Sequence, residues 1–465
     1  MQYISTRGGA PVDFKTALLN GLAPDGGLYV PATLPQFSPR EISAMAGLSY
    51  PELALEIMLP FVGTSFARSD LKRMIDAAYS TFRHDAIAPL TQLAPQHFVL
   101  ELFHGPTLAF KDFALQLLGH LLEAALADTG ERAVILGATS GDTGSAAIAG
   151  SMGRKKLDIV ILYPEGRTSE VQRRQMTTLN QKNIHALAVA GTFDDCQDMV
   201  KAMFSDAAFR AGRRLLAVNS INFARVLAQI VYYFYAALAL GSPARRVNFS
   251  VPTGNFGDIY AGYLARAMGL PVGRLIIATN KNDILARCVA TGEYIMQGVS
   301  ASLSPSMDIE ISSNFERLLF DLYGRDGAAL AKAMGDFRTT KSLKLTPSQL
   351  ADLRAVFAAH ATDDAATLAT IKHTYAASGY LLDPHTATGV AAVEACLNSL
   401  PQRGEGLVFV TLATAHPAKF PEAVREATGI TPALPPHLAD LYERTEKITP
   451  MARDVNALKE YIGAL

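Results

Sequence analysis

Lys111 is the residue of this chain that is best placed for covalent chemistry. The spacing of apolar and polar residues predicts a helix that is N-capped by Thr107, continues to about Ala127 and stops at Gly130. At helical spacing, Lys111 lies in one row with the leucines Leu115, Leu118 and Leu122. A buried ammonium group at the positive end of a helix has a lowered pKa, which suits a nucleophile and above all a Schiff base. The alternative is that Lys111 extends from the first turn into solvent.

A glycine-containing loop follows the apolar stretch 247–251 and precedes a helix predicted from about residue 259. Its residues are Thr253, Gly254, Asn255, Phe256 and Gly257. Free N–H groups at a helix N-terminus bind anions, and the glycines let the backbone approach a phosphate closely. The loop has neither the Lys-Ser/Thr of a Walker motif nor a GxGxxG pattern, so a small monophosphate fits better than a nucleotide. The alternative is an ordinary turn between a strand and a helix.

A second loop of this kind follows the apolar stretch 134–136 and is rich in hydroxyl groups. Its residues are Thr139, Ser140, Gly141, Asp142 and Thr143. Hydroxyl and amide groups at a helix N-terminus suit a carboxylate. The alternative is a dehydrogenase-like turn with Asp158 as the ribose-binding acid, but the glycine spacing does not fit that motif.

Two further loops follow predicted strands and carry polar side chains. The first supplies the amide of Asn222 and the guanidinium of Arg225 after the stretch 215–219. The second supplies Thr414 after the stretch 407–412, followed by His416 and Lys419. Because ligands in open α/β sheets lie beyond the carboxyl ends of strands, these loops are candidate parts of one site.

The composition argues against several classes of function. Lysine and arginine number 42 against 43 acidic residues in a chain of 465, so a basic surface for nucleic acid is not expected. The three cysteines form no CxxC pair, which argues against a disulfide framework or a zinc site and indicates a reducing compartment. The N-terminus lacks the apolar segment of a signal peptide, and the apolar run 230–240 is too short to cross a bilayer. We therefore expect a cytoplasmic protein without a metal, nucleic-acid or membrane partner.

The fold class follows from apolar stretches that alternate with helical patterns. Seven of them are predicted to be strands: 134–136, 158–163, 185–190, 215–219, 247–251, 274–279 and 407–412. Continuous apolar runs between helices indicate parallel strands that are covered on both faces. The chain is therefore predicted to be an α/β protein with two largely parallel sheets covered by helices, and 321–372 is predicted to be mostly helical.

Three domains are expected along the chain. A smaller N-terminal domain spans 1–95, and a catalytic core spans 96–430. The core contains two α/β subdomains, the smaller one at roughly 130–215. A tail at 431–465 ends in a helix.

Seven motifs together resemble the threonine synthase family. They are Tyr3-Ile-Ser-Thr-Arg-Gly8, Asp25-Gly-Gly-Leu-Tyr-Val-Pro31, Leu102 to Phe113, Ala138-Thr-Ser-Gly-Asp-Thr-Gly144, Asn219-Ser-Ile-Asn222, Pro252-Thr-Gly-Asn-Phe-Gly-Asp258 and Thr414-Ala-His-Pro-Ala-Lys-Phe420. The resemblance covers nearly the whole chain, and its opening motifs distinguish it from dehydratases and relatives of the tryptophan synthase β subunit. One departure is Thr253, where serine is expected as often; the hydroxyl group is retained.

The resemblance implies a tryptophan synthase β-like core of pyridoxal-phosphate fold type II and a bound pyridoxal 5′-phosphate. It implies conversion of O-phospho-L-homoserine and water to L-threonine and phosphate, the last step of threonine biosynthesis. Lys111 would hold the cofactor and move protons at Cα, Cβ and C4′. The loop 253–257 would hold the cofactor phosphate, and Thr414 would face the pyridine nitrogen.

The loop 139–143 would bind the substrate carboxylate or the hydroxyl group of the cofactor ring. Asn222 and Arg225 are the candidates for the substrate phosphate, because a guanidinium group matches phosphate geometry. Two alternatives stay open: a related phospho-lyase that yields a 2-oxo acid, and a non-catalytic homologue that binds the cofactor. The expected assembly is a monomer or a homodimer.

Overall fold

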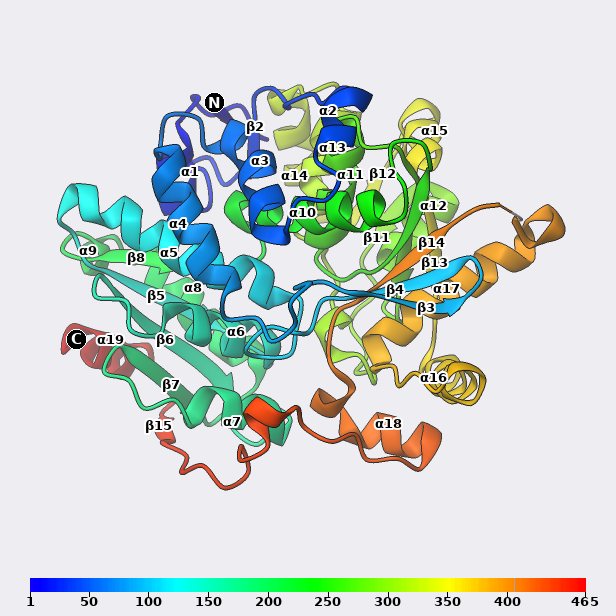
Figure 1. Ribbon diagram of the computed structural model, residues 1–465. Coiled ribbons are helices and arrows are strands. Elements are labelled where there is room, and N and C mark those ends of the chain that lie inside the picture. The colour runs from blue at the N-terminus through cyan, green and yellow to red at the C-terminus, as the bar shows by residue number, and fades with distance from the viewer. Residues whose placement is uncertain (405) are drawn as a thin grey trace.

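The computed structural model describes residues 1–404 and 406–465 and contains two large sheets (Figure 1). The order of the six-stranded sheet is β13 (Phe357–Ala361), β10 (Val272–Thr279), β9 (Val247–Pro252), β14 (Phe409–Ala413), β4 (His97–Glu101) and β3 (Leu90–Ala94). The order of the five-stranded sheet is β15 (Thr449–Met451), β7 (Ile184–Val189), β6 (Leu157–Pro164), β5 (Ala133–Ala138) and β8 (Arg214–Ala217). Every pair is parallel except β3 with β4. The predicted fold class, two largely parallel sheets, is confirmed.

The seven predicted strands all form, with ends that differ by at most two residues. β6 shows why the continuous apolar pattern was informative: every residue of its sequence LDIVILYP is buried, as expected for a strand with helices on both faces. Helices also separate the strands along the chain. They include α5 (Lys111–Thr129), α6 (Asp142–Ser151), α7 (Glu170–Thr177), α8 (Phe193–Ser205), α9 (Ala207–Arg210), α10 (Phe223–Ala239), α11 (Gly257–Ala267) and α12 (Ile284–Thr291).

The N-terminal segment packs against the core rather than standing apart from it. It comprises the antiparallel pair β1 (Tyr3–Ser5) and β2 (Tyr29–Pro31) with the helices α1 (Phe14–Asn20), α2 (Pro39–Ala44), α3 (Tyr50–Val62) and α4 (Arg68–Tyr79). α3 and α4 pack on α10 and α5, and their apolar residues share one continuous hydrophobic cluster with those helices. α10, which contains most of the apolar run 230–240, is buried along most of its length.

The stretch 321–372 is mostly helical, as predicted, but it also contains two strands. Helices do form there, namely α13 (Phe315–Leu322), α14 (Gly327–Thr340), α15 (Pro347–Val356) and α16 (Asp364–Ser378). However, the stretch also contributes β13 to the edge of the large sheet, and β12 (Ser342–Lys344), which pairs with β11 (Glu293–Ile295). β13 has the sequence FAAHA, which lacks β-branched residues, so pairing with β10 rather than local propensity makes it a strand.

The C-terminal part returns to the smaller sheet. It contains α17 (Pro384–Ser399), α18 (Pro421–Thr428) and the terminal helix α19 (Val455–Gly463). β15 pairs in parallel with β7, and α19 packs against α8, so the chain ends beside the smaller sheet (Figure 1). Among the described residues, no helix combines the length and the apolar character needed to cross a membrane.

Candidate active site

Lys111 is buried and lies at the first position of α5. The residue is 9% exposed, and its Nζ donates a hydrogen bond of 3.2 Å to Oδ2 of Asp142. Burial lowers the pKa of Lys111; Asp142 opposes the shift, while the positive charges of Lys419 and Arg225 add to it. The alternative in which Lys111 extends into solvent is therefore wrong, and a lysine with a lowered pKa is suited to nucleophilic chemistry.

The predicted N-cap of this helix needs a correction. The structure places the cap at Phe110, and Thr107 lies in the preceding turn. Thr107 is instead fixed by Asp112, whose carboxylate accepts a bond of 2.8 Å from the Thr107 N–H and another of 2.8 Å from its Oγ1. Because this carboxylate is fully buried, its pKa is raised, and its hydrogen bonds only partly offset that shift. Asp112 thus fixes the turn that precedes Lys111.

Asp142 is the centre of a buried polar network at the first position of α6. Its carboxylate contacts Lys111 at 3.2 Å, Lys419 at 2.7 Å, Gln172 at 2.9 Å and Ser306 at 3.1 Å. Burial alone would raise the pKa of Asp142, but the charges of Lys419, Lys111 and His385 outweigh it and hold the pKa well below its usual range. Asp142 is therefore an ionised carboxylate that attracts cations.

The other residues of the loop 139–143 divide into structural and accessible groups. The Oγ1 of Thr139 accepts hydrogen bonds from the N–H groups of Gly141 and Gly144, at 3.0 Å and 2.9 Å. Gly141 has a φ of 148°, and a Cβ there would lie 2.3 Å from the side chain of Gln172. Ser140 is exposed. Thr139 and Gly141 therefore hold the loop in shape, and Ser140 and Thr143 are the hydroxyl groups left for a ligand.

The glycine-containing loop between β9 and α11 forms a cup of backbone N–H groups. In the described part of the chain, no protein group accepts from the N–H groups of Gly254, Asn255 or Phe256. Phe256 caps α11 with a φ of 65°, a left-handed conformation that is uncommon for a residue with a side chain. Such a strained backbone at a helix N-terminus is typical of a built anion site.

The segment that precedes α13 closes one side of this cup. Ser312 donates to the carbonyl of Gly254, and Asn314 donates two bonds of 3.0 Å to the carbonyl of Asn255. Ile309 also packs here, since a Cβ on Gly254 would lie 2.8 Å from its side chain. The two carbonyls thus point away from the space into which the N–H groups are free to donate.

Arg225 is a buried cation without an ion-pair partner among the described residues. Its side chain is 4% exposed, and its Nε has no hydrogen-bond partner. Burial lowers its pKa to about 10, so the guanidinium group is charged at neutral pH and lacks a matching anion. Asn222, in contrast, is engaged at both ends: its Oδ1 accepts from Ala224 N–H at 3.1 Å and its Nδ2 donates to the carbonyl of Leu18 at 2.8 Å.

Thr414 follows β14, next to the start of α5. Its carbonyl accepts a 2.9 Å bond from Phe110 N–H, and its own N–H donates to the Oγ1 of Thr386 at 3.2 Å. Thr386 in turn donates to Asp383, whose carboxylate also lies 2.9 Å from Nδ1 of His385. Thr414 is thus held between the lysine helix and the N-terminus of α17.

Three residues near Asp142 were missed as site residues: Gln172, Ser306 and His385. A fourth, Lys419, was placed in a candidate loop but was given no role. Lys419 is fully buried and also donates a 2.7 Å bond to the carbonyl of Thr107. Its place after the strand at 407–412 is the reason that its loop was a candidate. His385 accepts from Ser306 N–H at 3.2 Å. Ser306 and Gln172 reach the site from loops and helices far away in the sequence, so no local pattern pointed to them.

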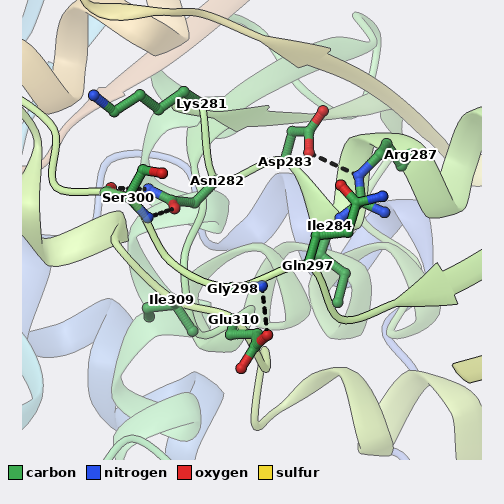
Figure 2. Close-up of a pocket in the computed structure, with 10 residues that line it drawn as sticks. All are labelled: Lys281, Asn282, Asp283, Ile284, Arg287, Gln297, Gly298, Ser300, Ile309 and Glu310. Carbon is green, nitrogen blue, oxygen red and sulfur yellow. Dashed lines mark hydrogen bonds and ion pairs between the residues drawn. The ribbon is translucent and has the colours of Figure 1, made fainter. Parts of the chain in front are cut away.

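A polar pocket of about 150 Å³ lies beside this site (Figure 2). Its charged groups are paired with one another or with the protein: Arg287 with Asp283 at 2.8 Å, and Lys281 with Asp364 at 2.7 Å. Ile309 lines it and also packs on Gly254, so the pocket and the glycine cup share one wall. The reactive site is therefore the neighbouring one, which contains the buried Lys111 and the unpaired Arg225, and not this pocket.

Comparisons with known proteins identify the family. The family described as "Threonine synthase N terminus" matches residues 2–79, "Pyridoxal-phosphate dependent enzyme" matches 83–412, and "Threonine synthase, C-terminal" matches 386–462. A threonine synthase from Pseudomonas aeruginosa is 56% identical over 465 residues, covering 100% of this chain and 98% of its own. The chain belongs to the threonine synthase family.

Solved structures of threonine synthases agree with this assignment. The pyridoxal-phosphate-bound enzyme from Brucella melitensis superposes with a TM-score of 0.96 at 51% identity, covering 99% of this chain and 98% of that one. The enzyme from Escherichia coli gives a TM-score of 0.83 at 34% identity, with both chains covered completely. The resemblance predicted from the motifs is confirmed, and this threonine synthase is a pyridoxal-phosphate-dependent enzyme.

The residues of this threonine synthase fit the cofactor. A cup of free N–H groups suits its phosphate, and a buried lysine with a lowered pKa suits its aldehyde. The cup carries no carboxylate of its own at Gly254 to Gly257, so nothing in the loop repels a phosphate.

Proposed function

We propose that this chain converts O-phospho-L-homoserine and water into L-threonine and phosphate, with Lys111 as the residue that holds pyridoxal phosphate. The observation that carries this proposal is the buried Lys111 beside two further buried cations, Lys419 and Arg225, of which only Lys419 has a carboxylate partner. A site with an excess of buried positive charge is suited to a substrate that carries both a carboxylate and a phosphate.

The cofactor, when bound, supplies an electron sink for carbanions formed next to the substrate amine. The N–H groups of the loop 253–257 would hold the cofactor phosphate at the N-terminus of α11, and Thr414 would be the partner of the pyridine nitrogen. Lys111 removes protons from Cα and Cβ of the substrate, and phosphate leaves from Cγ. Cγ takes up one proton and becomes the methyl group. A water molecule adds its hydroxyl group at Cβ and gives its proton to the departing phosphate, and Lys111 returns a proton to Cα.

Substrate contacts are divided between two groups of residues. Arg225 binds the substrate phosphate, supported by its burial and its lack of an ion-pair partner. Ser140 and Thr143, with the N–H groups of the loop, bind the substrate carboxylate or the cofactor hydroxyl. Asp142 is negative, so it attracts the Lys111 ammonium group and the incoming substrate amine rather than the carboxylate. Asn222, which is already engaged, stays a weaker candidate.

Several expectations stay predictions. They are the domain limits at 95 and 430, the cytoplasmic location and the assembly as a monomer or homodimer. The described cysteines are unpaired, as a reducing compartment would require.

Product analysis tests the proposed reaction. The purified protein, loaded with pyridoxal phosphate, is incubated with O-phospho-L-homoserine, and threonine, phosphate and 2-oxobutyrate are measured. We expect threonine and phosphate in equal amounts. Formation of 2-oxobutyrate without threonine would instead identify a phospho-lyase, and absence of phosphate release would indicate a non-catalytic homologue.

Replacement of Lys111 tests its role separately. Lys111→Ala is expected to lose the visible absorption band of the bound cofactor and at least about 10³-fold in turnover, because both the covalent link and the proton carrier are removed. Lys332→Ala, an exposed position on α14, is the control and should keep both. Survival of the absorption band in Lys111→Ala would disprove the assignment.

A further inference from the structure

The N-terminal motif that contains Thr6 and Arg7 is bonded to the helix that closes the glycine cup. Glu316, in the first turn of α13, accepts a 2.7 Å bond from the Oγ1 of Thr6. It also accepts two bonds from the guanidinium of Arg7, at 2.9 Å from Nε and 2.7 Å from Nη2. Both charged side chains are largely buried, at 10% and 6% exposed. A bidentate pair of this kind fixes geometry as well as charge.

The residue after Glu316 continues this connection. Arg317 is fully buried and donates a 3.0 Å bond from its Nε to the carbonyl of Tyr29, in the second N-terminal motif. The same guanidinium donates to the side chain of Asn314 and to the carbonyl of Ile221. Arg317 therefore fixes the side chain of Asn314 against the N-terminal segment.

Asn314 acts directly on the cup. It donates two bonds of 3.0 Å to the carbonyl of Asn255, one from its backbone and one from its side chain, while Ser312 donates to the carbonyl of Gly254. In a trans peptide the C=O of one residue and the N–H of the next point in opposite directions. Fixing the carbonyls of Gly254 and Asn255 therefore turns the N–H groups of Asn255 and Phe256 toward the opposite side, where the anion would bind.

We propose that Thr6 and Arg7 are positioning residues for the phosphate-binding N–H groups, acting through Glu316, Arg317 and Asn314. This proposal rests on the assignment of the loop 253–257 to the cofactor phosphate. It gives the N-terminal segment, which carries no reactive side chain of its own in the site, a role in holding the cofactor. Binding energy for the phosphate depends on N–H groups that are oriented before the ligand arrives.

We call Glu316 with its partners Thr6 and Arg7 the N-terminal clamp. A second clamp of the same composition provides a matched control. Glu446 accepts bonds from Arg173, at 2.9 Å from Nε and 3.0 Å from Nη2, and one of 2.7 Å from the Oγ1 of Thr177. It thus has the same threonine and arginine partners as Glu316, and it also joins segments far apart in sequence. This clamp ties α7 to the C-terminal segment and makes no contact with the glycine cup.

The test compares Glu316→Ala with Glu446→Ala, with the cofactor removed and then titrated back. If the N-terminal clamp positions the cup, Glu316→Ala should bind pyridoxal phosphate at least about tenfold more weakly, and Glu446→Ala less than about twofold more weakly. The ³¹P NMR resonance of the bound cofactor phosphate should shift only in Glu316→Ala. Comparable melting temperatures for the two variants would show that the two substitutions perturb stability equally.

A milder pair covers the case in which Glu316→Ala does not fold. Arg7→Lys keeps the charge but loses the bidentate contact, and Arg173→Lys does the same at the control clamp. Equal cofactor affinities within either pair, or an unchanged phosphorus resonance in the N-terminal variant, would overturn the proposal. Because the readout is cofactor binding, a wild-type protein that binds pyridoxal phosphate but makes no threonine would refute the proposed reaction and leave this inference standing.

Discussion

Asp142 and Asp258 occupy similar places in two strand–loop–helix segments, yet their surroundings shift their pKa values in opposite directions. Asp142 begins α6 after β5, and Asp258 is the second residue of α11 after β9. Both are buried. The pKa of Asp142 is held well below its usual range, whereas that of Asp258 is raised to about 6.

The difference comes from the partners of the two carboxylates. Burial would raise both pKa values, but Asp142 lies against the ammonium groups of Lys419 and Lys111. Asp258 has hydroxyl donors instead: its Oδ1 accepts from Tyr232 at 2.5 Å and from Tyr233 at 3.0 Å, and its Oδ2 has no hydrogen-bond partner among the residues that the structure describes. Hydroxyl groups offset burial less than full charges do.

The comparison shows how one local architecture serves two purposes. The α6 segment presents a fixed negative charge that holds cations, including the reactive lysine. The α11 segment carries a carboxyl group whose ionisation burial disfavours, beside backbone N–H groups that are suited to a phosphate. Replacement of each aspartate by asparagine should therefore have effects of opposite sign.

Asp142→Asn is expected to have the largest effect. It leaves the fully buried Lys419 without its carboxylate partner, and an uncompensated buried charge of this kind costs about 3–5 kcal/mol. Because the pKa of Asp142 is lowered, its contribution to stability is present above the unfolded value and is lost only as pH falls through the folded value. The loss measured by chemical denaturation of the apoprotein should thus be constant between about pH 5 and pH 8.

The double variant Asp142→Asn/Lys419→Met isolates the charge pair. Removal of both partners should recover more than half of the stability lost in Asp142→Asn, because Lys419, the more deeply buried of the two cations that contact Asp142, is then absent. Additive losses in the double variant would show that the two side chains do not interact as the 2.7 Å contact indicates.

Asp258→Asn should have a smaller effect of the opposite sign. The raised pKa of Asp258 means that its contribution to stability is fully present below the unfolded value of 3.8 and is lost as pH rises through about 6. Relative to asparagine, which does not titrate, the wild-type apoprotein should lose up to about 3 kcal/mol between about pH 4 and pH 8.

Denaturation curves of Asp258→Asn and wild type across this pH range provide the measurement. Asparagine retains the acceptor for Tyr232 and Tyr233, so the pH-dependent part of the difference reports the carboxyl group. A difference that does not change with pH would mean that Asp258 is ionised throughout, and the contrast with Asp142 would disappear.

The sequence alone predicted the loops 139–143 and 253–257 as binding loops, but not the charged side chains around them. Continuous apolar runs such as β6 identify buried parallel strands, and the loops that follow them are where ligands bind, so Lys111 and the loop 253–257 were accessible to local reasoning. The partners Ser306 and His385 come from other parts of the chain and carry no local signal. For the same reason, the sequence did not show that the Thr139 hydroxyl accepts two backbone hydrogen bonds. It was predicted to bind a ligand instead.

Thr139→Val and Thr253→Val should have the smallest of these effects, and they compare the loop 139–143 with the loop 253–257. The Oγ1 of Thr139 accepts from two buried N–H groups, whereas the Oγ1 of Thr253 only donates, at 2.6 Å, to the carbonyl of Val251. Valine keeps the branched shape in both cases but leaves two N–H donors unsatisfied at position 139 and one carbonyl with fewer bonds at 253. We expect a loss of about 2 kcal/mol for Thr139→Val and about 1 kcal/mol for Thr253→Val in the free energy of unfolding. Equal losses would mean that the Thr139 hydroxyl does not hold these two N–H groups. It would then be free to bind a ligand.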